Sequence, residues 1–218
     1  VTPGGSAVVA ILDTGVDVTH PDLAGSTVPG ISVLDGLDDL QSMDGADGLD
    51  GMSADGGSDP NGHGTAMAGI VAARTDNGVD IAGVGFAGVR VMPVTVLDAD
   101  GIGYDSDIIE GITYATDHGA DVILMAFSSP GFSEELQAAI DYAWAHGVVV
   151  VAAAGNGASS VPAYPAGGVR VIGVGATTQA NALAPSSNFG LGTFIVAPGV
   201  GIATTALGGG TGSVTGTS

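Results

Sequence analysis

Short, uninterrupted runs of apolar residues recur along the chain and predict buried strands. The first run is Ala7–Leu12. Similar runs follow at Val89–Val96, Asp121–Ala126, Val148–Ala153, Val169–Val174 and Thr193–Val196. Continuous stretches of Val, Ile, Leu and Ala of this length are typical of parallel strands that are buried on both faces.

Between these runs, apolar residues recur at intervals of three and four and predict three helices. One helix is predicted from Ser106 to a stop at Gly119. The next starts at Ser133 and ends at His146–Gly147, with an apolar stripe at Leu136, Ile140, Ala143 and Trp144. Another begins near His63 and runs through Met67, Ile70 and Val71. Ser at a helix start and Gly just beyond its end are common boundary signals.

The alternation of strands and helices predicts an α/β fold: a doubly wound, mostly parallel sheet with helices on both faces. Functional sites in such sheets form where loops leave the carboxyl ends of the strands. Two polar residues occupy such positions. Asp13 directly follows the first predicted strand, and Asn156 follows the strand at Val148–Ala153 after a turn at Gly155.

One segment, residues 35–59, interrupts this alternation with eight Asp, many Gly and no basic residue. We interpret it as an acidic insertion within a single domain that spans residues 1–218. Two roles remain open for it: a solvated surface loop, or a calcium site built from carboxylate oxygens. It does not match a full EF-hand pattern, because no Glu closes a twelve-residue loop.

The net charge of −20, from 23 acidic residues against 3 Arg and no Lys, excludes several kinds of partner. Nucleic-acid binding depends on Lys and Arg that neutralise phosphates, and docking on anionic membranes needs the same charges. The chain has no Cys, and therefore no disulfide or thiolate metal site. No apolar stretch is long enough to span a membrane, and no signal peptide is visible.

Hydrolysis of a peptide through a serine needs a hydroxyl nucleophile, an imidazole base, a carboxylate that orients the imidazole, and donors for the oxyanion. Four segments offer these groups in order: VAILDTGVD at 9–17, NGHGTAMAG at 61–69, VVVAAAGN at 149–156, and GTS at 216–218. Together they resemble the motifs of the subtilase family of serine proteases, and the resemblance covers essentially the whole chain.

The resemblance implies a serine endopeptidase acting on extended polypeptides. It gives Ser218 the role of nucleophile and His63 that of general base and then acid. Asp13 would orient His63 and stabilise its charged form. The side chain of Asn156 and the backbone N–H of Ser218 would bind the oxyanion.

The resemblance also places a substrate cleft. Gly101 and the segment formed by Ala126, Phe127 and Ser128 would pair with an extended substrate by β-addition. Ser128 replaces the glycine that is usual in the family.

Ala153, Gly155 and Ala166 are small, which suggests room for a sizeable side chain and a broad specificity with an apolar preference. A structural calcium ion is expected at Asp22 and at the 75–78 loop, which contains Asp76, with no cofactor for catalysis. The family further implies a secreted monomer whose partners include a propeptide or an inhibitor. His20, His118 and His146 are interpreted as structural or surface residues.

In the family, a buried helix starts at the nucleophile, whereas this sequence ends at Ser218. The 218-residue chain alone is therefore expected to be weak or inactive. An alternative is a non-catalytic subtilase-like module that serves as a binding or structural unit of a larger secreted protein. An acidic calcium-dependent adhesion domain would explain the charge but not the ordered motifs.

Overall fold

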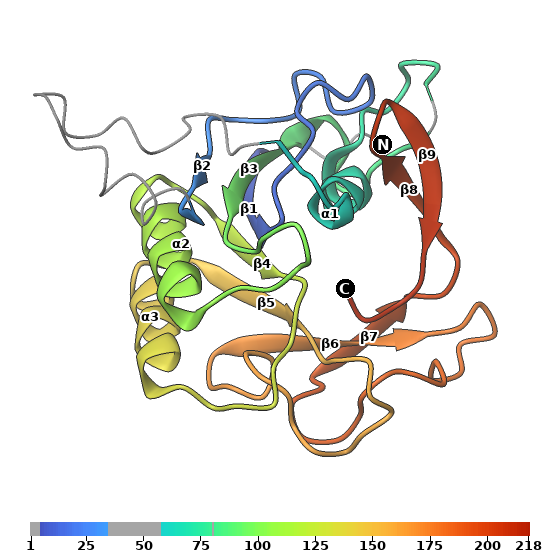
Figure 1. Cartoon of the computed structure of the whole chain (residues 1–218). Helices are drawn as coiled ribbons and strands as arrows, with labels where there is room; N and C mark the ends of the chain where they lie inside the picture. The colour runs from blue at the N-terminus through green and yellow to red at the C-terminus, as the bar shows by residue number, and fades with distance from the viewer. Residues whose placement is uncertain (1–4, 35–57, 80) are drawn as a thin grey trace, which may run out of the picture.

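Seven parallel strands form the central sheet of the computed structural model, which describes residues 5–34, 58–79 and 81–218 (Figure 1). The strand order is β2-β3-β1-β4-β5-β6-β7. Every neighbouring pair is parallel, as the buried apolar runs predict. The strands are β1 (Ala7–Asp13), β2 (Ile31–Ser32), β3 (Val89–Thr95), β4 (Val122–Met125), β5 (Val149–Ala153), β6 (Val171–Thr177) and β7 (Ile195–Pro198).

Helices cover both faces of this sheet. In Figure 1, α2 (Asp105–Asp117) and α3 (Glu134–Ala145) lie side by side on one face, and α1 (His63–Ala72) lies on the opposite face. A short 3-10 turn, η3 (Phe86–Gly88), precedes β3. An antiparallel hairpin of β8 (Ile202–Ala206) and β9 (Gly210–Val214) packs beside α1. The predicted doubly wound α/β fold is confirmed.

The residues of β1 alternate between two hydrophobic cores. Ala10 and Leu12 belong to the core beneath α2 and α3, whereas Ile11 belongs to the core beneath α1. Successive side chains of a strand point to opposite faces, so a strand covered on both sides must be apolar at every position. This explains the uninterrupted run that marks β1 in the sequence.

The start of α1 is fixed to the hairpin by side-chain hydrogen bonds. The buried hydroxyl of Thr205 donates to the carbonyl oxygen of Thr65 at 2.7 Å, and that of Thr204 donates to the carbonyl oxygen of Ala66. These bonds tie β8 to the first turn of the helix. The position of α1 is therefore set by both the central sheet and the hairpin.

The helix ends agree with their sequence signals. Ser133 caps α3 by accepting a hydrogen bond from the backbone N–H of Leu136 at 3.2 Å. Gly119 and Gly147, both with φ of 84°, follow α2 and α3 in the left-handed conformation that favours glycine. At each end a histidine donates Nδ1–H to the carbonyl of the tyrosine four residues earlier: His118 to Tyr114 and His146 to Tyr142. Both side chains are exposed, in agreement with the prediction that these histidines are structural or surface residues.

Three strand predictions need correction. The strand predicted at Asp121–Ala126 is limited to Val122–Met125, and the one predicted at Val169–Val174 extends instead over Val171–Thr177. The run at Thr193–Val196 becomes β7 at Ile195–Pro198, and all four of its residues are exposed. The prediction that this run is buried on both faces is wrong for the described structure, because β7 lies at one edge of the sheet beyond β1, β3 and β5, the strands against which the helices pack.

The apolar stripe predicted for α3 is correct except at Trp144. Leu136, Ile140 and Ala143 are buried, whereas Trp144 is 52% exposed. Each residue advances a helix by about 100°, so Trp144 lies at the margin of the stripe that Ala143 anchors. Of the acidic segment at 35–59, only Ser58 and Asp59 lie within the described residues.

We predict that Ile140→Ala lowers the free energy of unfolding by about 2–5 kcal/mol, because Ile140 is 1% exposed and its truncation leaves a cavity. Trp144→Ala, on the same helix, is expected to change it by about 0.5 kcal/mol or less. Urea unfolding of the two variants measures the difference. A larger loss for Trp144→Ala would contradict this assignment of the packed face.

Candidate active site

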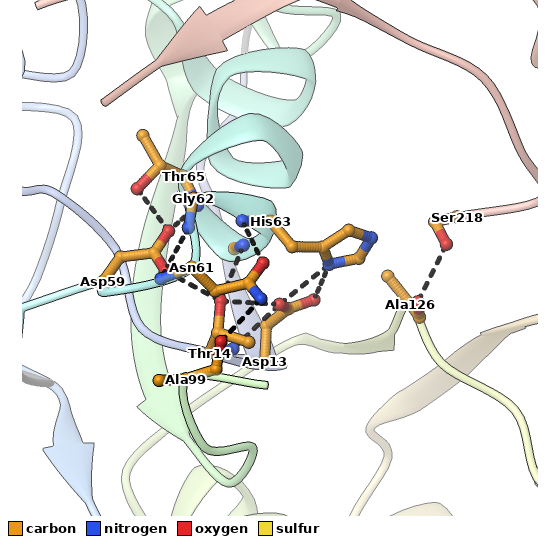
Figure 2. A network of polar contacts seen from close by, with 11 residues as sticks. Asp13, Thr14, Asp59, Asn61, Gly62, His63, Thr65, Ala99, Ala126 and Ser218 are labelled. Atoms are coloured by element: carbon orange, nitrogen blue, oxygen red, sulfur yellow. Dashed lines mark hydrogen bonds and ion pairs between the residues drawn. The ribbon is translucent and has the colours of Figure 1, made fainter. Parts of the chain in front are cut away.

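The pair formed by Asp13 and His63 joins the predicted segments at 9–17 and 61–69. Asp13 is the last residue of β1 and fully buried, and His63 is the first residue of α1. The Nδ1 atom of His63 lies 2.9 Å from both carboxylate oxygens of Asp13. Figure 2 shows the imidazole between Asp13 and the side of the site on which Ser218 and Ala126 lie.

The backbone next to His63 must approach β1 closely for this pair to form. A Cβ atom on Gly64 would collide with the carbonyl oxygen of Gly15. The glycine after the histidine is therefore required by packing, since no other residue lets the helix start directly against the turn after β1. The backbone N–H of Gly64 also donates to the Thr14 hydroxyl at 3.2 Å.

The hydrogen bond to Asp13 raises the pKa of His63 above its ordinary value of 6.5. Partial burial acts in the opposite direction, and the negative charges of Asp13 and Asp59 raise the pKa further. The Nδ1–H group donates to the carboxylate, which leaves Nε2 as the nitrogen that can accept a proton. The site thus holds an oriented imidazole with increased basicity.

His63, Asn156 and Ser218 line the same cavity, which has a volume of about 520 Å³. Ser218 is exposed, and its hydroxyl donates a hydrogen bond to the carbonyl oxygen of Ala126 at 2.9 Å. In this arrangement the hydroxyl hydrogen points to Ala126 rather than to His63. The three residues come from distant parts of the chain, so the fold alone brings them together.

Contacts with the 216–218 segment orient Asn156. Its Oδ1 atom accepts the backbone N–H of Thr217 at 2.9 Å, and the Thr217 hydroxyl accepts the N–H of Gly155 at 3.0 Å. Since Oδ1 is bound in this way, the amide NH₂ group is the part of Asn156 that can donate to a bound group. This side chain and the serine segment hold each other in place.

Asn188 braces the loop that carries Asn156, and sequence reasoning missed it. Its Oδ1 atom accepts the backbone N–H groups of Gly157 and Ser159, both at 3.0 Å, while its Nδ2 donates to the carbonyl of Ala154 at 2.9 Å. No motif surrounds Asn188 in the sequence. Its partners lie about thirty residues away, so only the folded chain reveals this role.

Asp59 was also missed as a site residue, because the sequence groups it with the acidic segment. It is buried and lies at the start of α1 (Figure 2). The signal that could have found it is its position four residues before His63, in the Asp-Pro-Asn-Gly turn that leads into the helix.

The residues predicted to bind substrate lie in loops beyond the strands. Ala126, Phe127 and Ser128 follow the end of β4 and are therefore not part of the strand as predicted; Ala126 is buried and Ser128 is exposed. Gly101 is exposed in a turn closed by its N–H bond to the carbonyl of Asp98 at 2.9 Å. Asn61, two residues before His63, donates its Nδ2 to the neighbouring carbonyl of Ala99 and links this turn to α1.

The small residues predicted to leave room for a substrate side chain are packed. Ala153 ends β5 and is buried, as is Gly155. Ala166 lies within the core beneath α2 and α3. None of them lines the 520 Å³ cavity.

The two residues predicted to bind calcium have different surroundings. Asp22 is fully buried, and its carboxylate accepts hydrogen bonds from Asn77 Nδ2 at 2.6 Å and from the backbone N–H of Ile81 at 3.1 Å. Asp76 is exposed, with a positive φ of 59°. His20 is buried and bonded to Asp22 N and to the carbonyl of Gly210, which agrees with the structural one of the two roles predicted for it.

The family model that describes the subtilases matches residues 4–218. The chain belongs to the subtilase family. It is 42% identical to a thermophilic serine proteinase of Bacillus sp. (strain AK1), over 95% of this chain and 48% of the relative. It is 39% identical to thermitase of Thermoactinomyces vulgaris, over 91% of this chain and 65% of thermitase. For subtilisin BL of Lederbergia lenta the identity is 38%, over 99% of this chain and 72% of the relative.

This subtilase chain therefore spans about half the length of one relative and about two thirds of another. Within residues 5–34, 58–79 and 81–218, none of its helices has the length and apolarity needed to cross a membrane.

We predict that Asp13→Asn lowers the pKa of His63, because the substitution removes both the charge and the strongest acceptor of Nδ1–H. An NMR titration of the imidazole C–H signals measures this pKa. The remaining three histidines serve as internal controls and should titrate as before. An unchanged His63 titration would show that the pair seen here does not form in solution.

Proposed function

We propose that this subtilase chain is the catalytic part of a serine endopeptidase that hydrolyses peptide bonds in extended polypeptides. The observation that carries the proposal is the pair formed by the buried Asp13 and the partly exposed His63, whose imidazole faces the cavity that Ser218 and Asn156 also line. The names of the relatives, a serine proteinase and a subtilisin among them, support the same chemistry.

In the proposed reaction, the Ser218 hydroxyl leaves its bond with Ala126 and turns to His63 Nε2. As the serine oxygen forms a bond with the substrate carbonyl carbon, its proton moves to Nε2. The buried carboxylate of Asp13 holds Nδ1–H and stabilises the resulting imidazolium. The imidazolium then donates the proton to the leaving amine, and a water molecule cleaves the acyl-serine by the same steps in reverse roles.

The oxyanion formed in each step would be held by two donors. One is the Asn156 amide NH₂, which the Thr217 N–H bond to Oδ1 leaves available. The other is the backbone N–H of Ser218. Loss of one such donor typically lowers kcat by about 10²–10³-fold.

The proposed substrate cleft is bordered by Gly101 and by Ala126, Phe127 and Ser128. These segments extend past the ends of β3 and β4. An extended peptide could pair with their backbone groups without strong sequence demands. We retain a broad specificity with an apolar preference as part of the proposal.

The proposed setting is a secreted monomeric enzyme whose catalytic domain includes residues 1–218, with the acidic segment at about 35–59 as an insertion. A propeptide or inhibitor would occupy the same cleft as the substrate. The net charge of −20 argues against nucleic acid and anionic membranes as partners.

The test is reaction of the full-length protein with a fluorophosphonate, followed by mass spectrometry. We expect one adduct on Ser218, and we expect Ser218→Ala and His63→Ala to abolish it, since each removes the nucleophile or its base. Asn156→Ala should retain labelling and lower kcat for a peptide substrate by about 10²-fold or more.

Tyr142→Phe, at the end of α3 away from the cavity, is the matched control and should behave as the parent protein. Absence of labelling and turnover in the folded full-length protein would favour the non-catalytic subtilase-like module. In that case the Ser218 hydroxyl would stay bonded to the carbonyl oxygen of Ala126 and would not turn to His63.

We further propose a structural calcium ion at Asp22. A fully buried carboxylate without a charged partner among the described residues fits a nearby cation, because an unpaired buried charge is costly. The same residues contain no group of three or more His, Asp or Glu side chains that could hold a metal. The ligands besides Asp22 would therefore be backbone or amide oxygens, with Asp76 at the exposed rim.

If calcium binds there, a chelator should lower the thermal midpoint of the full-length protein, because an ion that binds only the folded state stabilises it. Asp22→Asn should remove this chelator dependence, whereas Asp141→Asn on the surface of α3 should preserve it. A midpoint that the chelator leaves unchanged in the parent protein would exclude the ion.

A further inference from the structure

A second buried carboxylate, Asp59, lies beside the catalytic pair but does not touch His63. It is 5% exposed and belongs to the short connection that precedes α1. Its Oδ2 atom accepts the backbone N–H of Thr65 at 2.8 Å and the Thr65 hydroxyl at 2.6 Å. Its Oδ1 atom accepts the N–H of Gly62 at 2.7 Å and that of Asn61 at 3.2 Å.

These bonds replace the missing cap of α1. The residue at the N-cap position, Gly62, has no side chain, although the first N–H groups of a helix need acceptors. Asp59 accepts the N–H of Thr65, and the Thr14 hydroxyl accepts the N–H of Gly64. The Asn61 side chain accepts the N–H of His63 at 3.3 Å. The first turn of the helix that carries His63 is therefore held by groups that lie outside the helix.

Thr14 connects the two carboxylates. Its hydroxyl donates to Asp59 Oδ1 at 2.8 Å and lies farther, at 3.3 Å, from Asp13 Oδ1. Because a hydroxyl has a single hydrogen, the shorter bond to Asp59 fixes its direction. The backbone N–H of Thr14 donates to Asp13 Oδ1 at 2.8 Å, so the residue bound to Asp59 also holds the carboxylate that orients His63.

We propose that Asp59 is a positioning residue for the reaction, which holds His63 through the first turn of α1 and Asp13 through Thr14. Figure 2 shows Asp59, Thr14 and Asp13 linked by these contacts, on the side of the helix start away from Ser218. The proposal rests on the proposed function only for its effect on turnover. The geometry that it describes exists with or without activity.

The charge of Asp59 acts in the same direction as its hydrogen bonds. A negative charge at a helix N-terminus is favourable, and in a buried setting it also stabilises a nearby imidazolium. The charge of Asp59 indeed contributes to the raised pKa of His63. Asp59 thus favours the protonated imidazole that forms when Ser218 attacks.

The test compares Asp59→Asn in the full-length protein with the parent. Asparagine keeps the shape but places an NH₂ group against existing donors, which leaves at least one of them without an acceptor. We expect kcat to fall by about 10–10²-fold with KM little changed, because misplacement of a catalytic group affects the transition state more than binding. We also expect a lower pKa of His63 by NMR titration.

Two further variants test the link through Thr14. Thr14→Val removes the hydroxyl at nearly constant volume and should reproduce part of the loss in kcat, whereas Thr14→Ser keeps the hydroxyl and should restore most of it. In the double variant that combines Thr14→Val with Asp59→Asn, the two losses in kcat should not add, since both substitutions act through one network.

The matched control is Asp105→Asn, which removes the same charge from the first turn of α2. It should leave kcat and the His63 titration as in the parent protein. All variants are compared below their thermal midpoints, so that unfolding does not contribute.

A lower thermal midpoint for Asp59→Asn with kcat and His63 pKa unchanged would overturn the proposal and leave Asp59 as a structural cap only. If the parent protein shows neither turnover nor Ser218 labelling, the proposed function fails. The NMR titration of His63 then tests the positioning role of Asp59 by itself. A lower His63 pKa in both Asp59→Asn and Thr14→Val, which changes no charge, then supports positioning, whereas an unchanged His63 pKa in Thr14→Val overturns it.

Discussion

The contact between the buried carboxylate of Asp13 and the imidazole of His63 is the constraint on which the rest of the site depends. A carboxylate at the end of a central strand loses its hydration and must find donors within the protein. Here the donors are the imidazole of His63 and the backbone N–H of Thr14. To bring the imidazole this close, α1 has to begin directly above the end of β1, which only the glycine at position 64 allows.

The positions of α1 and of the loop that carries Asn156 also depend on elements far away in the chain. The β8 hydroxyls of Thr204 and Thr205 hold the first turn of α1 from the side opposite the sheet. Asp59 and Thr14 supply the acceptors that the helix start lacks. On the other side of the cavity, Asn188 and Thr217 fix the loop that carries Asn156. The side chains of Asp13, His63 and Asn156 are thus oriented by partners that are themselves buried or hydrogen-bonded, which is how proteins hold reactive groups in place.

The strongly acidic composition is compatible with this site because the charges have different surroundings. Asp13, Asp22 and Asp59 are buried, and each accepts several hydrogen bonds. Other acidic residues lie on the surface, as in the ion pair between Asp141 and Arg170 at 2.6 Å, which lowers the pKa of Asp141. Exposed charges are screened by solvent, whereas Asp59 and Asp13 act on His63 at short range in a poorly hydrated region.

The sequence by itself determined the fold class and most of the strands and helices, and it predicted the four residues that we propose for catalysis. It could do so because burial on both faces of a parallel sheet forces continuous apolar runs, and because the motifs around Asp13, His63 and Asn156 lie within single segments. Only the tertiary structure decided the contacts of Asp59 and Asn188, the exposure of Trp144 and β7, and the bond between the Ser218 hydroxyl and Ala126. These features depend on contacts between residues distant in the chain or on the position of a strand in the sheet, and no local pattern records either of them.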